Sequence, residues 1–184
     1  MNTELTKFLD AHGVDYTIEN DRVVVGDHLD LRSVKEIPEG FNPIVQGCLD
    51  LRSLMSLPKG FNPTVWWSLD LSSLTTIPEG FNPKVGLSLD LRSLTTVPAG
   101  FNPMVYMDIF LDSLTSIPAG FKPWVGGSLY LRGLTTIPDG FDPIVGGNLY
   151  LNNLSTIPAG FNPQRVDGEI ILPDHLKHLI NKAS

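Results

Sequence analysis

The sequence predicts a mainly-β solenoid, in which short strands and turns form one coil and the coils repeat along an axis. Three observations predict it. A twenty-residue unit recurs without interruption from Leu29 to about Gly168, and such a fixed period is typical of solenoids. Six positions of the unit are apolar, more than one coil can bury alone, so neighbouring coils must cover one another. Each unit also carries two prolines and at least one glycine, which excludes long helices.

Seven copies of the unit follow one another, and its positions are numbered here from the first apolar residue. The copies begin at Leu29, Leu49, Leu69, Leu89, Ile109, Leu129 and Leu149. Positions 1 and 3 are apolar, whereas position 2 is polar in the first four copies. A strand with one buried face requires this alternation. Positions 6, 9, 13 and 17 complete the apolar set. We expect each position to form a column along the stack, with the phenylalanines of position 13 packed one on the next.

Proline at position 10 and glycine at position 12 predict a turn in every coil. In the first coil these residues are Pro38 and Gly40. The fixed φ and missing N–H of proline suit the end of a short extended run. Glycine two residues later suits a backbone with positive φ. A second proline, Pro43 in the first coil, predicts another turn.

Residues 1–28 lack the repeat and are predicted to cap the first coil. Thr3 is expected to cap a short helix that ends near Gly13, with Leu5, Phe8 and Leu9 on one face. Two β-prone runs, 16–19 and 22–25, are joined by Asn20-Asp21 and predict a hairpin. Such a segment covers both the open core and the free strand edge at the end of a solenoid.

Residues 169–184 are predicted to close the other end of the stack. Residues 169–172 form a last strand, and Pro173 begins a short helix. The apolar side of that helix, made of Leu176, Leu179 and Ile180, is expected to lie over the final coil. The repeats occupy residues 29–168 between the two caps. The whole chain, residues 1–184, is therefore predicted to be a single domain.

The pattern Leu-x-Leu-x-x-Leu-Thr-x-Ile-Pro-x-Gly-Phe resembles the leucine-rich repeat, particularly its short bacterial and phage forms. The resemblance covers about three quarters of the chain and implies a right-handed parallel solenoid that binds other proteins. The repeat differs from the family pattern at position 6. This position holds leucine, or once Val34, whereas the family usually has asparagine or cysteine there. The resemblance therefore does not imply the family's asparagine ladder or its usual curvature.

Composition excludes several classes of function. The formal charge of −7 and a pI near 4.9 disfavour nucleic-acid binding, which needs a basic stripe. No apolar run is long enough to span a membrane, and the polar start of the chain is not a secretory signal. Cys48 is the only cysteine, so no internal disulfide can form. These features predict a cytoplasmic protein, although export without a classical signal stays open.

No catalytic constellation, cofactor motif or metal site is predicted. His175 and His178 lie three residues apart on the expected helix, which is a weak zinc pattern beside the alternative of an exposed helix face. Cys48 occupies position 20, where other copies have serine, asparagine or aspartate, and is interpreted as a tolerated small residue. Enzyme activity is the least favoured class, because no nucleophile and base can be assembled from these columns.

Position 2 changes from acidic to aromatic midway along the repeats. An acidic column is followed by an aromatic column: Asp30, Asp50, Asp70 and Asp90, then Phe110, Tyr130 and Tyr150. Arginines at position 4, among them Arg92 and Arg132, offset the carboxylates. A charge-compensated sheet surface is therefore the first interpretation of the acidic column, and a calcium site is a weaker one. The aromatic column indicates either a partner site or packing within the sheet.

Positions 18 and 19 also differ among the copies. Later copies have Gly-Gly there, whereas three consecutive earlier copies carry large apolar residues: Trp66, Trp67, Leu87, Tyr106 and Met107, with Met104 and Trp124 nearby at position 16. Because Gly126-Gly127 builds the same turn, the large residues point to an added function. Tryptophan, tyrosine and methionine are enriched at interface centres. The alternative is that one side chain of each pair fills a groove beneath the turn.

These patterns predict a non-enzymatic interaction protein with no cofactor, which binds another protein through the strand face and the adjoining turns. Inhibition of a host defence enzyme or a nucleic-acid-acting enzyme is a specialisation suggested by analogy with phage-type proteins. Two alternatives stay open. One is a small-ligand or nucleotide-sequestering protein that uses Arg92, Arg132 and the tyrosines. The other is an acidic mimic of nucleic acid that uses the acidic column.

Overall fold

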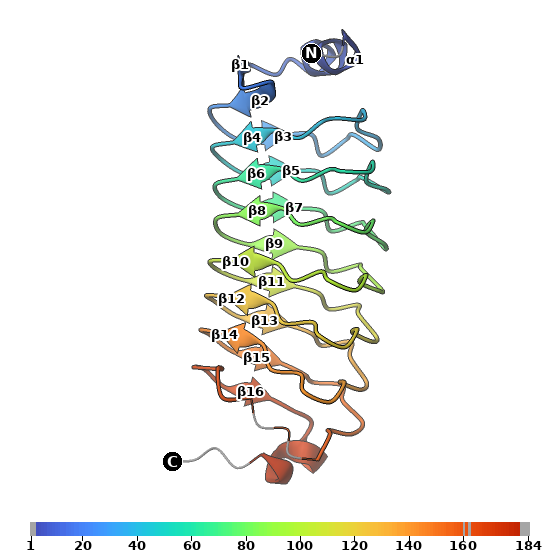
Figure 1. Cartoon of the computed structure of the whole chain (residues 1–184), viewed down its shortest axis with the longest axis vertical. Coiled ribbons are helices and arrows are strands. Elements are labelled where there is room, and N and C mark those ends of the chain that lie inside the picture. The colour runs from blue at the N-terminus through green and yellow to red at the C-terminus, as the bar shows by residue number, and fades with distance from the viewer. Residues whose placement is uncertain (1–2, 160, 162, 181–184) are drawn as a thin grey trace.

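The chain forms a parallel β-solenoid of about seven coils, with helical turns at both ends (Figure 1). The computed structural model describes residues 3–159, 161 and 163–180. Two eight-stranded sheets run the length of the stack, and apart from the N-terminal hairpin all their strands are parallel. Each strand pairs with its equivalent one coil away, for example Leu29 with Leu49 and Val45 with Val65. The predicted mainly-β solenoid is therefore confirmed.

The second sheet is built from positions 1 and 2 of the repeat. Its strands are β3 (Leu29–Asp30), β5 (Leu49–Asp50), β7 (Leu69–Asp70), β9 (Leu89–Asp90), β11 (Ile109–Phe110), β13 (Leu129–Tyr130), β15 (Leu149–Tyr150) and β16 (Ile170–Ile171). Position 1 is buried, and position 2 faces outward at intermediate to exposed accessibility. This is the strand that the alternation of residues predicted.

The first sheet is built mostly from positions 16 and 17 and, apart from the N-terminal hairpin, was not predicted. Its strands are β1 (Thr17–Glu19), β2 (Arg22–Val25), β4 (Ile44–Val45), β6 (Thr64–Val65), β8 (Lys84–Val85), β10 (Met104–Val105), β12 (Trp124–Val125) and β14 (Ile144–Val145). Proline at position 15 and valine at position 17 point inward, so positions 14, 16 and 18 face outward. A bend at positions 18–20 joins each first-sheet strand to the next second-sheet strand.

The phenylalanine column forms a continuous ladder through one hydrophobic core that extends from Leu5 to Leu176. From Phe41 to Phe161, successive ring centroids lie 6.2–6.4 Å apart with interplanar angles of 5–18°. This packing was predicted. Neighbouring strands lie only about 4.8 Å apart, so the coils are spaced more widely at the phenylalanines. The stack therefore curves with its strands on the shorter side, and Figure 1 shows the opposite turns fanned out.

An asparagine ladder occupies position 14, not position 6. The Asn42 side-chain oxygen accepts the N–H of Asn62, and the Asn42 amide donates to the Gly60 carbonyl at 2.9 Å. Asn62 repeats both bonds with Asn82 and Gly80. Each asparagine thus joins one coil to the next. This ladder was not predicted, because the family pattern places asparagine at position 6, although asparagine recurs at position 14 in most copies.

The turns and the N-terminal cap follow the predictions where the structure describes them. Gly40 and its five described equivalents have φ between 72° and 83°. Gly160, the seventh, lies outside the described residues. Helix α1 (Thr3–Ala11) is followed at Gly13 by a turn, in which the φ of Gly13 is 64° and its N–H donates to the Asp10 carbonyl. The side chain of Thr3, the predicted cap, also lies outside the described set. The β1–β2 hairpin turns at Asn20 and Asp21, both with positive φ.

The C-terminal cap corrects the prediction in one respect. The last strand is β16, and a 3₁₀ helix, η1 (Asp174–Leu179), follows Pro173. Leu176 is buried against the core, and Ile180 packs partly against it. Leu179 is 51% exposed, so the expectation that all three side chains cover the final coil was wrong. Leu176 and Ile180 therefore anchor the segment, and Leu179 points away from the core.

Candidate protein-binding surface

The acidic column is held by arginines of the same coils. Asp30, Asp50 and Asp90 each form an ion pair with the arginine two residues later, at 2.5–2.6 Å. The same carboxylates, and that of Asp70, also accept the backbone N–H of the residue two positions on. Arg52 reaches the next coil as well, at 3.5 Å from Asp70. These aspartates therefore form the turn after each strand and compensate the charge of the arginines.

The aromatic column is packed within the second sheet. The ring centroids of Phe110 and Tyr130 lie 4.7 Å apart, and those of Tyr130 and Tyr150 lie 4.5 Å apart, with nearly parallel planes. The Arg132 guanidinium lies 4.6 Å and 4.9 Å from the two tyrosine centroids, and it pairs with Asp112 at 3.3 Å. Arg92 lies 5.7 Å from the Phe110 centroid. All three rings are half-buried, so each ring face is largely covered by its neighbours.

Position 20 carries a third ladder on this face. The N–H of Ser128 donates to Asp108 at 2.7 Å, and the N–H of Asn148 donates to Ser128 at 3.1 Å. At the N-terminal end, the N–H of Cys48 donates to the Nδ1 atom of His28 at 3.0 Å. Short polar side chains therefore serve this position by accepting a bond from the next coil. Burial, followed by the Asp108 charge, raises the pKa of the neighbouring Tyr130 hydroxyl.

The bend cluster, which comprises Trp66, Trp67, Leu87, Tyr106 and Met107, is the most exposed large apolar surface among the predicted site residues. It occupies three consecutive bends between the two sheets, and its side chains are 40–63% exposed. Two ring contacts support it from neighbouring positions. Trp67 meets His28 edge-to-face at 4.9 Å, and Tyr106 meets the half-buried Trp124 of β12 at 5.4 Å. The cluster was expected from the sequence, and the structure brings its five members onto adjacent bends.

Glycine at position 18 allows one coil to come close to the backbone of the preceding coil. A Cβ atom on Gly86 would lie 1.9 Å from the Trp66 carbonyl oxygen, and one on Gly126 would lie 2.3 Å from that of Tyr106. The backbone at these glycines therefore passes close to the backbone of the preceding coil. As a result, no side chain stands between Trp66 and Tyr106 in the column.

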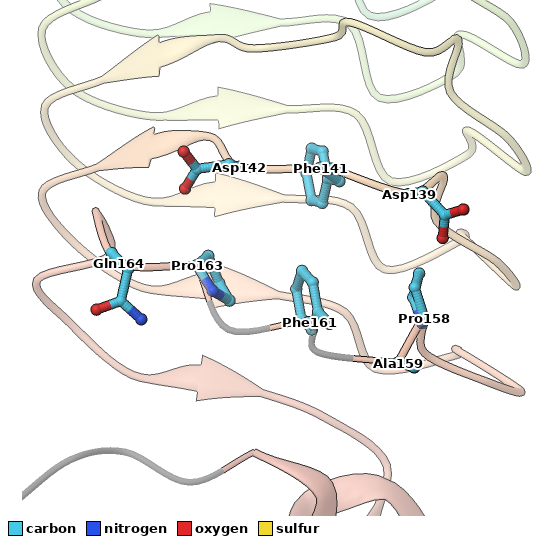
Figure 2. Close-up of a pocket in the computed structure, with 9 residues that line it drawn as sticks. Asp139, Phe141, Asp142, Pro158, Ala159, Phe161, Pro163 and Gln164 are labelled. Atoms are coloured by element: carbon cyan, nitrogen blue, oxygen red, sulfur yellow. The ribbon is translucent and has the colours of Figure 1, made fainter.

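None of the hollows whose lining residues are described is lined by a member of the bend cluster. One of about 540 Å³ lies between the turns of the last two coils, with Asp139 and Phe141 on one side and Pro158 and Phe161 on the other (Figure 2). Its lining borders Gly160 and Asn162, which lie outside the described residues. Over the described part of the chain, no three His, Cys, Asp or Glu side chains gather where they would hold a metal ion.

Comparisons with known proteins give no information on function. No protein-family model matches the chain, and neither the curated proteins nor the solved structures yield a match. Within the described ranges, neither helix has the length and apolarity needed to cross a bilayer.

Proposed function

We propose that this chain is a non-enzymatic interaction module that binds another protein through the bend cluster and the outward strand faces beside it. The exposure of five large apolar side chains on three consecutive bends supports this proposal most directly. Monomeric proteins rarely expose contiguous apolar patches of large size without an interaction role. The same residue types dominate the energetic centres of protein interfaces.

The bend cluster is independent of the fold's own requirements. Gly126-Gly127 and Gly146-Gly147 occupy the same two positions in later coils and join the same pair of sheets. Folding therefore does not need tryptophan at residues 66 and 67. The presence of large apolar residues at exposed positions where other coils have glycine favours a binding role.

The two alternative functions receive less support. A nucleotide binder that uses Arg132 would have to break the contacts of its guanidinium with Asp112 and the tyrosine rings. A mimic of nucleic acid needs free carboxylates, whereas Asp30, Asp50 and Asp90 are ion-paired to arginine. Protein binding, including the inhibition of an enzyme by the bound module, fits the exposed apolar surface better.

The test replaces Trp66 and Trp67 together by glycine, the residue that later coils use. Met55→Thr is the matched control, because Met55 is 63% exposed at a turn position where later coils have threonine. Affinity capture from cells of the native source, followed by mass spectrometry, compares both variants with the wild type. We expect the double variant to fold by circular dichroism and to lose its captured proteins, while Met55→Thr keeps them. Capture of the same proteins by the double variant would contradict the proposal.

A further inference from the structure

The outward face of the first sheet is basic on an otherwise acidic chain. Positions 14–19 of the first five coils, residues 42–47, 62–67, 82–87, 102–107 and 122–127, contain none of the chain's 20 aspartates and glutamates. They contain two lysines, Lys84 and Lys122. The formal charge of the whole chain is −7, so this face has the opposite sign to the protein that carries it.

Both lysines are available to a partner. Lys84, on β8, and Lys122, which precedes β12 by two residues, are exposed, and neither forms an ion pair within the described ranges. Arg22 of β2 adds a third cation near one end, where it donates to the Thr64 hydroxyl at 3.3 Å. Acidic residues flank this face along the chain, as Asp108 after Met107 does, and also lie at its ends. Glu19 and Asp21 belong to the N-terminal hairpin, and Asp142 of the sixth coil is paired with Arg165.

Met104 lies in the coil between the two lysines, and Tyr106 lies beside it toward the bend. Met104 occupies the same column as Lys84 one coil further on, and it pairs in register with Trp124. Met104 is 60% exposed and Tyr106, two residues later, is 63% exposed. Two coils and two residues separate Lys84 from Lys122, a distance of roughly 12 Å at ordinary strand geometry. About four residues of extended chain cover that distance.

From this arrangement we infer that the first-sheet face, centred on Met104 and Tyr106, docks an acidic protein segment with interspersed apolar side chains. Carboxylates of the segment pair with Lys84 and Lys122, and its apolar side chains cover Met104 and Tyr106. The inference rests on the proposed function and adds the chemistry of the partner. It also places the docking surface on the first-sheet side of the bend cluster and not on the second sheet, whose outward residues bond one another.

Charge complementarity selects this occupant over nucleic acid. A phosphate backbone needs a continuous basic stripe, because its affinity comes from several phosphate contacts made together. Two lysines on a chain of charge −7 do not supply that stripe. A short acidic segment needs only two carboxylates at the lysines. Complementary charge of this kind directs association and fixes register.

The test uses defined peptides. A fluorescein-labelled peptide of about twelve residues alternates glutamate with leucine, and two counterparts replace every glutamate by lysine or by glutamine. Fluorescence anisotropy measures binding to the full chain and to the double variant Lys84→Glu/Lys122→Glu. We expect the glutamate peptide to bind most tightly and the double variant to lower its affinity about tenfold. Added salt should weaken the wild-type complex.

The matched control is Lys59→Glu, which changes an exposed lysine on the turn side to the residue that Glu39 and Glu79 provide at the same position. It should leave the affinity unchanged. Binding should also shift the indole N–H resonance of Trp124 in NMR spectra. The inference is overturned if no peptide binds, if the lysine peptide binds as tightly, if the double variant matches the wild type, or if a single-stranded oligonucleotide binds more tightly. Loss of capture by the Trp66/Trp67 variant together with any of these results would keep the proposed function and remove this inference.

Discussion

The rings of Tyr130 and Tyr150 stack at 4.5 Å with an interplanar angle of 6°. This spacing is close to the separation of neighbouring strands, so the two side chains rise together from equivalent places in adjacent coils. Their faces cover each other and leave mainly the ring edges for a partner. The aromatic column therefore stabilises the second sheet, as cross-strand aromatic pairs do, and the more exposed bend cluster is the better candidate for contact.

Loss of one rung of the phenylalanine ladder should destabilise the protein strongly. Phe81 is 3% exposed and stacks on Phe61 and Phe101. We expect Phe81→Ala to lower the free energy of unfolding by about 3–5 kcal/mol, because it removes buried surface and leaves a cavity. Urea denaturation measures the change. Met55→Ala, at a 63% exposed site, is the control and should change it by less than about 0.5 kcal/mol. Equal losses in the two variants would disagree with this account.

The asparagine ladder should contribute measurably to stability. Asn62 accepts one hydrogen bond from the next coil and donates another to Gly80. Asn62→Ala leaves the N–H of Asn82 and the Gly80 carbonyl without these partners, so we expect a loss of about 1–3 kcal/mol in the free energy of unfolding. Asn152→Ala, at an exposed position of the last coil, should have little effect in the same denaturation experiment. A neutral Asn62→Ala variant would show that water replaces the ladder.

Gly86 should not tolerate a side chain. A Cβ atom there meets the Trp66 carbonyl oxygen at 1.9 Å, so the backbone of one coil must shift. We expect Gly86→Ala to cost about 3 kcal/mol, which appears as a lower melting temperature. Gly26→Ala is the matched control, because its nearest neighbour would be a flexible Gln46 atom at 3.9 Å. Similar melting temperatures for the two variants would refute the close approach.

The Asp30–Arg32 contact should give a defined pH dependence. The hydrogen bonds from Arg32, first that of its side chain, lower the pKa of Asp30 below the ordinary value of 3.8. The pKa of Asp30 in the folded state is then lower than in the unfolded state. The contact therefore stabilises the fold fully at pH values above the unfolded pKa. Its contribution is lost as the pH falls through the folded pKa.

An NMR titration of the Asp30 carboxyl should therefore have a midpoint below 3.8 in the wild type and a higher one in Arg32→Gln. Asp174, whose pKa is lowered by Lys177 at the other end of the chain, provides an internal reference and should not respond. If the Asp30 midpoint is the same in both proteins, the arginine has no role in its ionisation.

Much of the architecture could be predicted from the sequence, because a twenty-residue period places equivalent residues on top of one another. The phenylalanine ladder from Phe41 to Phe161 follows from that period and from the apolarity of one position. The first sheet was missed because Pro43, directly before β4, was interpreted only as a turn. The curvature follows from the difference between ring spacing and strand spacing, which no single residue encodes.

The candidate site could be predicted only in part. The large residues at Trp66, Trp67 and Tyr106 were recognisable because later coils replace them by glycine. Their exposure depends on the bend between two sheets, of which only one was expected. Lys84 and Lys122 were missed for the same reason: without the first sheet, nothing placed them on a common face. Comparison of charges down positions 14 and 16 would have found them.

The hydrogen bonds that join the coils have a consequence for how this chain changes its length. Neighbouring coils with asparagine at position 14 present the same acceptor to the next coil, as Asn42 does to Asn62 and Asn62 to Asn82. Duplication or deletion of one whole unit therefore leaves both new junctions with matching partners. The molecule can lengthen or shorten in steps of one coil, and each added step brings a fresh set of outward residues whose substitution leaves the interior untouched.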